Sequence, residues 1–392
     1  ALACRALLPA VTAPATTESS TTANAVVTAT SVPAAPTLPA STHVELPAWL
    51  ADFEAYISQR FEQDQIPGLA YALVLPGGGT YAQALGYRDV ENQLPVTADT
   101  LFHIASTQKS MNAMLVASLV DDGFFDWDTP AAEIYPGFTL ADPDYARQVT
   151  FVHLLSMTSG IPDEAEDALN LSTATPEDVF AAAASARPLG LPGAEFSYSN
   201  LSAALAGYIA GYAYSGDPDL YQGYVRALSE RVLVPIGMPS ATFSVSAARA
   251  SADFAYSYTG RGQRAESEDL DRDPLAPAGT LKVSVTDMAV YVATQLGQGL
   301  APNGTQVVSA ANLAFTWQPH RDNYALGWDI AQQSGYTVIW HTGAFDNYAS
   351  LLAFIPELDV GLVILANSEA AAYNLTEDAA FDLLQIILEQ GV

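Results

Sequence analysis

Two residues spaced one helical turn apart could form a nucleophile and its base. Ser106 and Lys109 stand in the run Ser-Thr-Gln-Lys just before an apolar segment that predicts a helix, so their side chains fall on one helix face. A serine hydroxyl needs a neighbouring base to take its proton, and a lysine whose pKa is lowered by burial can do so. The chain has only two lysines, Lys109 and Lys282. The pattern also fits a helix-capping serine followed by a surface lysine.

A tyrosine and an asparagine two residues apart form a second candidate group. Tyr198 and Asn200 lie in Tyr-Ser-Asn, again just before an apolar helical segment. A phenol beside an ammonium group could act as a phenolate and move a proton between the serine and the leaving group, and the amide could orient a substrate. A Ser-Asn pair that starts a helix explains the same residues. The motif therefore indicates little when it stands alone.

The third candidate group is the tripeptide His341-Thr342-Gly343, at the end of a strand-like run. Chance produces this tripeptide less often than the other two motifs, because the chain has only five histidines. The histidine and threonine could project into a cleft, and the glycine lets a substrate approach the strand. The N–H groups of Ala344 and Ser106 could then hold an oxyanion. A histidine bonded to a neighbouring carbonyl at a strand end is the alternative.

These groups need a scaffold, and the hydrophobic pattern predicts strands at both chain ends with alanine-rich helices between them. The sequence therefore predicts an α/β fold: an antiparallel sheet built from both chain ends and flanked by helices, with an inserted, mostly α-helical lobe. The predicted strands are 68–75, 80–87, 336–340, 350–355 and 360–366, and the clearest predicted helices are 47–61, 109–120, 176–184, 201–214 and 371–389.

The amino-terminal segment differs in composition from the rest. Residues 9 to about 42 are almost entirely Ala, Thr, Pro, Ser and Val, which offer few large side chains to bury, so we expect a tether. We divide the chain into this tether, 1–45, and a folded domain, 46–392, with a sheet lobe at about 46–105 and 280–392 and a helical lobe at about 106–279. The run Ala-Leu-Ala-Cys resembles the tail of a bacterial lipoprotein signal, which makes Cys4 a lipidation candidate. A lone cysteine in a residual signal fits equally well.

The composition excludes several kinds of partner. A formal net charge of −29 repels nucleic acid and anionic lipid head groups. Cys4 is the only cysteine and the five histidines show no ligand spacing, so we expect no metal and no other cofactor. No apolar run reaches the roughly 18 residues that a transmembrane helix needs.

In this order the three motifs resemble the S-x-x-K, Y-x-N and K-T-G set of the serine β-lactamase and penicillin-binding superfamily, with His341 in place of the lysine. Three further runs look like the same family: Leu-Phe-His-Ile-Ala-Ser ending at Ser106, His-Leu-Leu-Ser-Met-Thr-Ser-Gly starting at His153, and Tyr-Ala-Leu-Gly-Trp starting at Tyr324. The resemblance runs from about residue 46 to the carboxyl end. It is closest to class C β-lactamases, D-alanyl-D-alanine carboxypeptidases and related serine esterases, and it implies an α/β sandwich with an all-α lobe.

The resemblance implies a serine acyl hydrolase that works through an acyl-enzyme. Ser106 would be the nucleophile, and Lys109 and Tyr198 would move the proton. A neutral imidazole holds a carboxylate less firmly than an ammonium does, which weakens the β-lactamase interpretation. His-Thr-Gly beside Tyr-Ser-Asn looks more like the D-alanyl-D-alanine carboxypeptidase branch, although esterases of the superfamily also depart at this motif. The substrate would be bound by Asn200, His341, Thr342 and Gly343.

Other functions within the superfamily stay open. A carboxylesterase or a weak β-lactamase is the alternative, and a penicillin-binding sensor whose acyl-enzyme never turns over is a further one. Arg321 could anchor a substrate carboxylate, although a solvated loop residue explains it better. We expect a monomer that takes a small-molecule or peptide substrate with an amide or ester carbonyl. Its expected location is extracellular or in the cell envelope, with a lipid anchor if Cys4 is modified.

Overall fold

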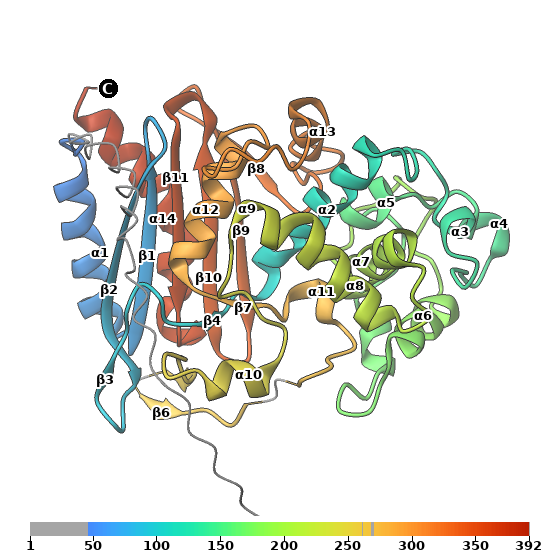
Figure 1. Cartoon of the computed structure of the whole chain (residues 1–392), viewed down its shortest axis with the longest axis horizontal. Coiled ribbons are helices and arrows are strands. Elements are labelled where there is room, and N and C mark those ends of the chain that lie inside the picture. Colours follow the sequence, from blue (N-terminus) through green and yellow to red (C-terminus); the bar gives the residue numbers. More distant parts are fainter. Residues whose placement is uncertain (1–45, 261, 268–269, 392) are drawn as a thin grey trace, which may run out of the picture. The chain divides into compact units, whose positions relative to one another are not determined.

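An antiparallel sheet joins segments from the two ends of the described chain (Figure 1). The computed structural model describes residues 46–260, 262–267 and 270–391, so the predicted tether and Cys4 lie outside the described residues. The 7-stranded sheet has the order β3-β2-β1-β11-β10-β9-β8. Its strands are β1 (Gly68–Leu75), β2 (Gly79–Asp89), β3 (Leu94–Pro95), β8 (Asp329–Gln333), β9 (Tyr336–Phe345), β10 (Tyr348–Ile355) and β11 (Val360–Ala366).

The pairing of β1 with β11 joins the strands from the two chain ends into one sheet. The register runs from Leu69 opposite Ala366 to Val74 opposite Gly361. The first two predicted strands form a hairpin, because β1 pairs with β2 up to Leu75 opposite Gly79. The predicted α/β fold, with one antiparallel sheet built from both chain ends, is therefore confirmed.

The central strands are buried on both faces, so the sheet separates two hydrophobic cores. Along β1, Ala70 and Ala72 belong to one core, whereas the alternating residues Leu69 and Tyr71 belong to the other. This follows from the two-residue period of a strand, which sends successive side chains to opposite faces. Continuous apolar runs such as the one over β1 are what burial on both faces requires.

Helices from opposite ends of the chain cover one face of the sheet. α1 (Leu50–Asp64) packs on α14 (Glu369–Glu389), and α14 packs on β9, β10 and β11. On the other face, α12 (Val285–Leu296) packs on β1 and β11. Figure 1 shows α1 and the carboxyl end of the chain at the same edge of the sheet.

The segment between the short strands β4 (Phe102–His103) and β7 (Lys282–Val283) is mostly helical. Its longest helix, α7 (Asn200–Ser215), is buried from Leu201 to Gly211 and packs against α2, α5 and α8. The remaining helices and strands are η1 (Ala105–Gln108), α2 (Lys109–Asp121), α3 (Ala131–Ile134), α4 (Pro143–Ala146), α5 (Phe151–Leu155), η2 (Asp163–Ala168), α6 (Pro176–Ser185), α8 (Leu220–Leu228), η3 (Ser229–Leu233), α9 (Val234–Ile236), α10 (Val245–Ala250), β5 (Tyr258–Thr259), β6 (Gln263–Arg264), α11 (Ala276–Gly279), α13 (Ala310–Thr316) and η4 (Pro356–Leu358).

The structure corrects one strand boundary that matters for the site. The predicted strand 336–340 continues as β9 to Phe345, so His341-Thr342-Gly343 lies inside the strand rather than after it. Pairing with β10 holds this extension, with Gly343 opposite Ser350. The neighbouring strand β8 pairs with β9 only as far as Trp340. The outer edge of β9 beyond Trp340 therefore has no strand beside it within the described sheet.

Candidate active site

Ser106 lies in a tight turn that other segments hold from two sides. It belongs to the 3-10 helix η1, which leads directly into α2, and Ala105 before it has a φ of 47°. A Cβ added to Gly279 would lie 2.6 Å from the carbonyl carbon of Ala105, and one added to Gly343 would lie 2.9 Å from the backbone nitrogen of Ser106. Only glycine permits approaches this close. The turn is thus packed closely between α11 and β9.

Lys109 is buried completely and faces the Ser106 hydroxyl. Its Nζ donates to Ser106 Oγ at 2.8 Å, to Asn200 Oδ1 at 2.9 Å and to the carbonyl of Ala278 at 2.8 Å. No carboxylate forms a salt bridge with it in the part of the chain that the structure describes. Burial lowers the pKa of Lys109 to about 7, against the opposing attraction of Glu166 and Asp163. At neutral pH a large share of the molecules therefore hold an unprotonated amine beside the serine.

Tyr198 and Asn200 reach the same point from the start of α7. The Ser199 hydroxyl caps this helix by accepting from the backbone N–H of Ser202 at 3.3 Å, which fixes the residues on either side of it. The ring of Tyr198 lies under Lys109, with Nζ 4.9 Å from the ring centroid. Burial raises the pKa of Tyr198 above its ordinary value, against a hydrogen bond with Ser106 that lowers it. Tyr198 therefore keeps its proton at neutral pH, and the phenolate considered from the sequence is disfavoured.

His341 is buried, and both of its ring nitrogens are bonded within the protein. Nδ1 lies against the carbonyl oxygen of Thr342, so it must carry the proton and donate. Nε2 then accepts from the Tyr324 hydroxyl at 2.9 Å. Burial and the charge of Lys109 lower the pKa of His341 to about 3, which keeps the imidazole neutral. No ring N–H is left to bind a substrate carboxylate.

The Thr342 side chain also bonds within the protein. It lies on the face of β9 opposite to His341, because neighbouring residues of a strand face opposite sides. Its hydroxyl donates to Glu377 of α14 at 3.2 Å. Of the residues after the histidine, Ala344 and Phe345 line the pocket beside Ser106. Ala344 lies at the edge of β9 that has no neighbouring strand in the described sheet, and Ser106 lies in η1, where the first N–H groups of a helix lack helical acceptors. Both positions fit the predicted pair of oxyanion donors.

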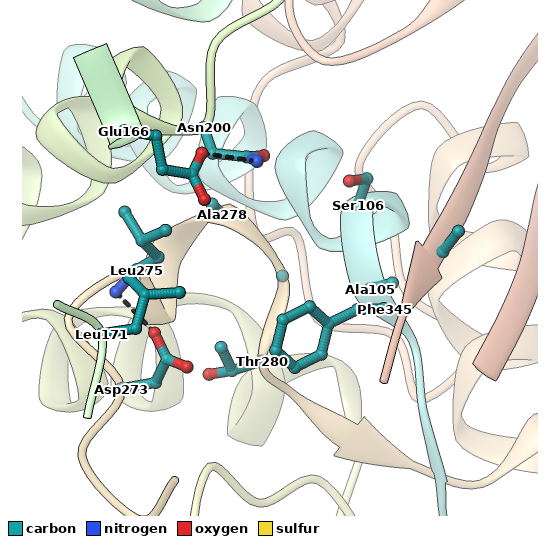
Figure 2. A pocket seen from close by; sticks show the side chains of 12 residues that line it. Ala105, Ser106, Glu166, Leu171, Asn200, Asp273, Leu275, Ala278, Thr280 and Phe345 are labelled. Atoms are coloured by element: carbon teal, nitrogen blue, oxygen red, sulfur yellow. Dashed lines mark hydrogen bonds between the residues drawn. The ribbon is translucent and has the colours of Figure 1, made fainter. Parts of the chain in front are cut away.

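A pocket of about 400 Å³ opens beside Ser106 (Figure 2). The site residues predicted from the sequence that line it are Ser106, Asn200 and Ala344, whereas Lys109 and Tyr198 are not among the lining residues. Two carboxylates that sequence reasoning missed, Glu166 and Asp273, also line it. They come from η2 and from the loop before α11, and no local motif marks them.

Glu166 is linked to Lys109 through the side chain of Asn200. The amide Nδ2 of Asn200 donates to Glu166 Oε2 at 3.0 Å, while its Oδ1 accepts from Lys109. Partial burial raises the pKa of Glu166, and Lys109 opposes that rise. The asparagine side chain thus has both polar ends bonded and bridges Lys109 to the Glu166 carboxylate.

Other groups considered from the sequence lie elsewhere. Arg321 is exposed and lies 3.8 Å from Asp322, as a solvated loop residue would. Lys282 is buried on β7, opposite His103 of β4. The described residues contain no cluster of three or more His, Cys, Asp or Glu that could hold a metal ion. Among the same residues, no helix combines the length and apolarity needed to cross a membrane.

Known proteins and solved structures resemble this chain over most of its length. It is 29% identical to penicillin-binding protein 4 of Amycolatopsis lactamdurans over 82% of this chain and 87% of the relative. It is 24% identical to protein flp of Staphylococcus aureus strain MW2 over 80% of this chain, but it spans only 62% of that protein's length.

Similar folds occur in an octameric penicillin-binding protein homologue from Pyrococcus abyssi and in a class C β-lactamase from Rhodobacter sphaeroides. The first has a TM-score of 0.71 and 25% identity and covers 86% of this chain and 77% of its own. The second has a TM-score of 0.68 and 22% identity and covers 86% of this chain and 99% of its own. Residues 53–385 match the Beta-lactamase family. The chain therefore belongs to that family, within the serine β-lactamase and penicillin-binding superfamily.

Proposed function

We propose that this protein is a serine acyl hydrolase that forms an acyl-enzyme on Ser106. The observation that carries the proposal is the 2.8 Å contact between Lys109 Nζ and Ser106 Oγ, made by a lysine whose pKa burial lowers to about 7. A base with a pKa near the working pH combines a large unprotonated fraction with useful basicity. Family membership supports this reaction class.

The proposed reaction has an acylation half and a deacylation half, and each half has two proton transfers. Neutral Lys109 takes the proton of Ser106 as Oγ attacks the substrate carbonyl, and the N–H groups of Ser106 and Ala344 stabilise the oxyanion. The C–O bond to Ser106 remains when the carbonyl re-forms, and the leaving group departs with a proton relayed from Lys109 through the Tyr198 hydroxyl. Water then attacks the ester carbonyl and gives one proton to the same relay, which returns a proton to Ser106 Oγ as the bond between Oγ and the acyl carbon breaks and the acid is released.

The proposed substrate class depends on whether the site has a group that could bind a substrate carboxylate. The resemblance favours peptides ending in D-alanine, which carry a carboxylate on the leaving group. His341 has both nitrogens bonded within the protein and Arg321 is exposed and close to Asp322, so neither supplies a ready anchor for that carboxylate. We therefore propose small amides and esters as the substrate class, and D-alanyl-D-alanine carboxypeptidase activity stays a prediction within it.

Steady-state kinetics on p-nitrophenyl acetate, nitrocefin and a D-alanyl-D-alanine peptide test the proposal. We expect Ser106→Ala to reduce turnover of every accepted substrate to background, because no nucleophile remains. Ser58→Ala is the matched control, since Ser58 is an exposed serine on α1. Undiminished activity in Ser106→Ala would refute the mechanism. A burst of one equivalent of product without turnover would instead support a penicillin-binding sensor.

A further inference from the structure

The charges that line the catalytic pocket are negative. Glu166 and Asp273 line it together with Ser106, and no Lys or Arg is among its described lining residues. The buried base Lys109 is not a lining residue, and its charge is lost as the pH rises through about 7. An anionic substrate would meet like charge in this space, whereas a cationic one would be attracted.

Asp273 points into the pocket with one oxygen unoccupied (Figure 2). The residue is only 3% exposed. Its Oδ1 accepts from the backbone N–H of Leu275 at 2.7 Å, and no hydrogen bond from a described residue reaches Oδ2. Burial raises the pKa of Asp273, while the charge of buried Lys282 and the Leu275 N–H favour the ionised form. Because Asp273 lines the pocket, Oδ2 is available to accept a hydrogen bond from a ligand there.

Thr280 supplies a second buried polar group with an open hydroxyl. Its side chain is 4% exposed and lines the same pocket. Its backbone N–H donates to the carbonyl of Ala276, but its Oγ1 has no hydrogen-bond partner in the described part of the chain. In Figure 2 the Thr280 hydroxyl and the Asp273 carboxylate point toward one another. Neither residue belongs to the motifs that carry the catalytic groups.

We propose that Asp273 and Thr280 form a subsite for a primary ammonium group on the acyl part of the substrate. An ammonium offers three N–H donors and no acceptor, which suits a carboxylate oxygen and a hydroxyl that both lack a donor. Leu171 and Leu275 line the same space and would shield this charge-assisted contact from water.

The acyl part of the substrate stays bonded to Ser106 after the leaving group departs. An enclosed subsite therefore suits the acyl part better than it suits the leaving group. The substrates are then amides or esters of amino acids with a free amine. This inference rests on the proposed acyl hydrolase function, because it assigns the substrate of the same pocket.

The test compares alanine p-nitroanilide, in both D and L forms, with the N-acetyl and N-succinyl derivatives. Acetylation removes the charge, and succinylation replaces it with a carboxylate. We expect kcat/KM to fall about 10- to 100-fold on acetylation, as for loss of a hydrogen-bonded charge, and further on succinylation. Asp273→Asn should bring the amine-to-acetyl ratio close to one, and Thr280→Val should lower it less. Glu164→Gln, an exposed neighbour of Glu166 on η2, should leave the ratio unchanged.

The proposed function and the ammonium subsite fail in different ways. If Ser106 is required for hydrolysis of p-nitrophenyl acetate but the amine-to-acetyl ratio is near one, the subsite is wrong and the hydrolase stands. If hydrolysis does not require Ser106, the hydrolase fails, and binding then decides on the subsite. Alaninamide, but not N-acetylalaninamide, should raise the Tm of the Ser106→Ala protein, and Asp273→Asn should abolish that rise. Equal shifts with the two compounds would overturn the subsite.

Discussion

Two parts of the site differ in what their polar side chains bond to. We call them the helical wall, formed by η1, α2 and the start of α7, and the strand wall, formed by β9. On the helical wall, Ser106, Lys109 and Asn200 bond to one another at 2.8–2.9 Å and face the place where a carbonyl would react. On the strand wall, His341 and Thr342 bond to other parts of the protein. In the proposed mechanism the helical wall therefore acts through its side chains, while β9 would offer a substrate its backbone edge.

The difference extends to the two buried bases. Burial lowers the pKa of both Lys109 and His341, to about 7 and about 3. The negative charges of Glu166 and Asp163 hold the pKa of Lys109 up, whereas the charge of Lys109 pushes that of His341 down. Nearby charge thus decides which base titrates near neutral pH and which stays neutral throughout.

Removing the base from the helical wall should have the largest effect. Lys109→Met leaves Ser106 without a proton acceptor, so we expect kcat/KM to fall by about 10²–10⁴-fold. Lys109→Arg should be similarly inactive, because a guanidinium stays charged. Steady-state kinetics together with a thermal unfolding curve for each variant separate chemistry from folding. Activity within a fewfold of the wild type in folded Lys109→Met would assign the base elsewhere.

A substitution on the strand wall should have a smaller and unselective effect. His341→Gln disturbs the contact with Tyr324 but removes no group that is free to bind substrate, so we expect a loss of about tenfold. The loss should be equal for a neutral ester and for a β-lactam that carries a carboxylate. Kinetics on the pair of substrates check this. A loss confined to the carboxylate-bearing substrate would show that His341 binds it after all.

The smallest expected effect is a shift of the pH profile. Glu166 raises the pKa of Lys109, so Glu166→Gln should lower it. Because the amine acts unprotonated, the variant should stay active to lower pH than the wild type. The acid limb of kcat/KM against pH measures this shift, with Glu164→Gln as the matched control. A shift of the acid limb to higher pH would contradict the electrostatic account.

Local spacing predicted the helical wall better than the strand wall. Ser106 and Lys109 meet because residues three apart in helical backbone share a face, which a sequence displays directly. His341 and Thr342 were both expected to face a substrate, yet continuation of β9 sends their side chains to opposite sides. That continuation depends on pairing with β10, a contact that the tripeptide itself does not encode.

The remaining pocket residues depend on tertiary packing. Glu166 and Asp273 are 107 residues apart in the sequence and lie in a short 3-10 helix and a loop, so no periodic pattern relates them. The sheet could be predicted because its strands are long, apolar and bounded by turns. Its short partners β3 and β8 could not, because they lack such a pattern.

The pH dependence of covalent labelling at Ser106 tests the central claim most directly. The protein is treated with a fluorophosphonate or a fluorescent penicillin between pH 5 and 9, and the modified peptide is identified by mass spectrometry. The account predicts that the label sits on Ser106 and that its rate of formation falls as the pH drops below about 7, where Lys109 becomes protonated. Labelling at another residue, or a rate at Ser106 that is flat across this range, would contradict it.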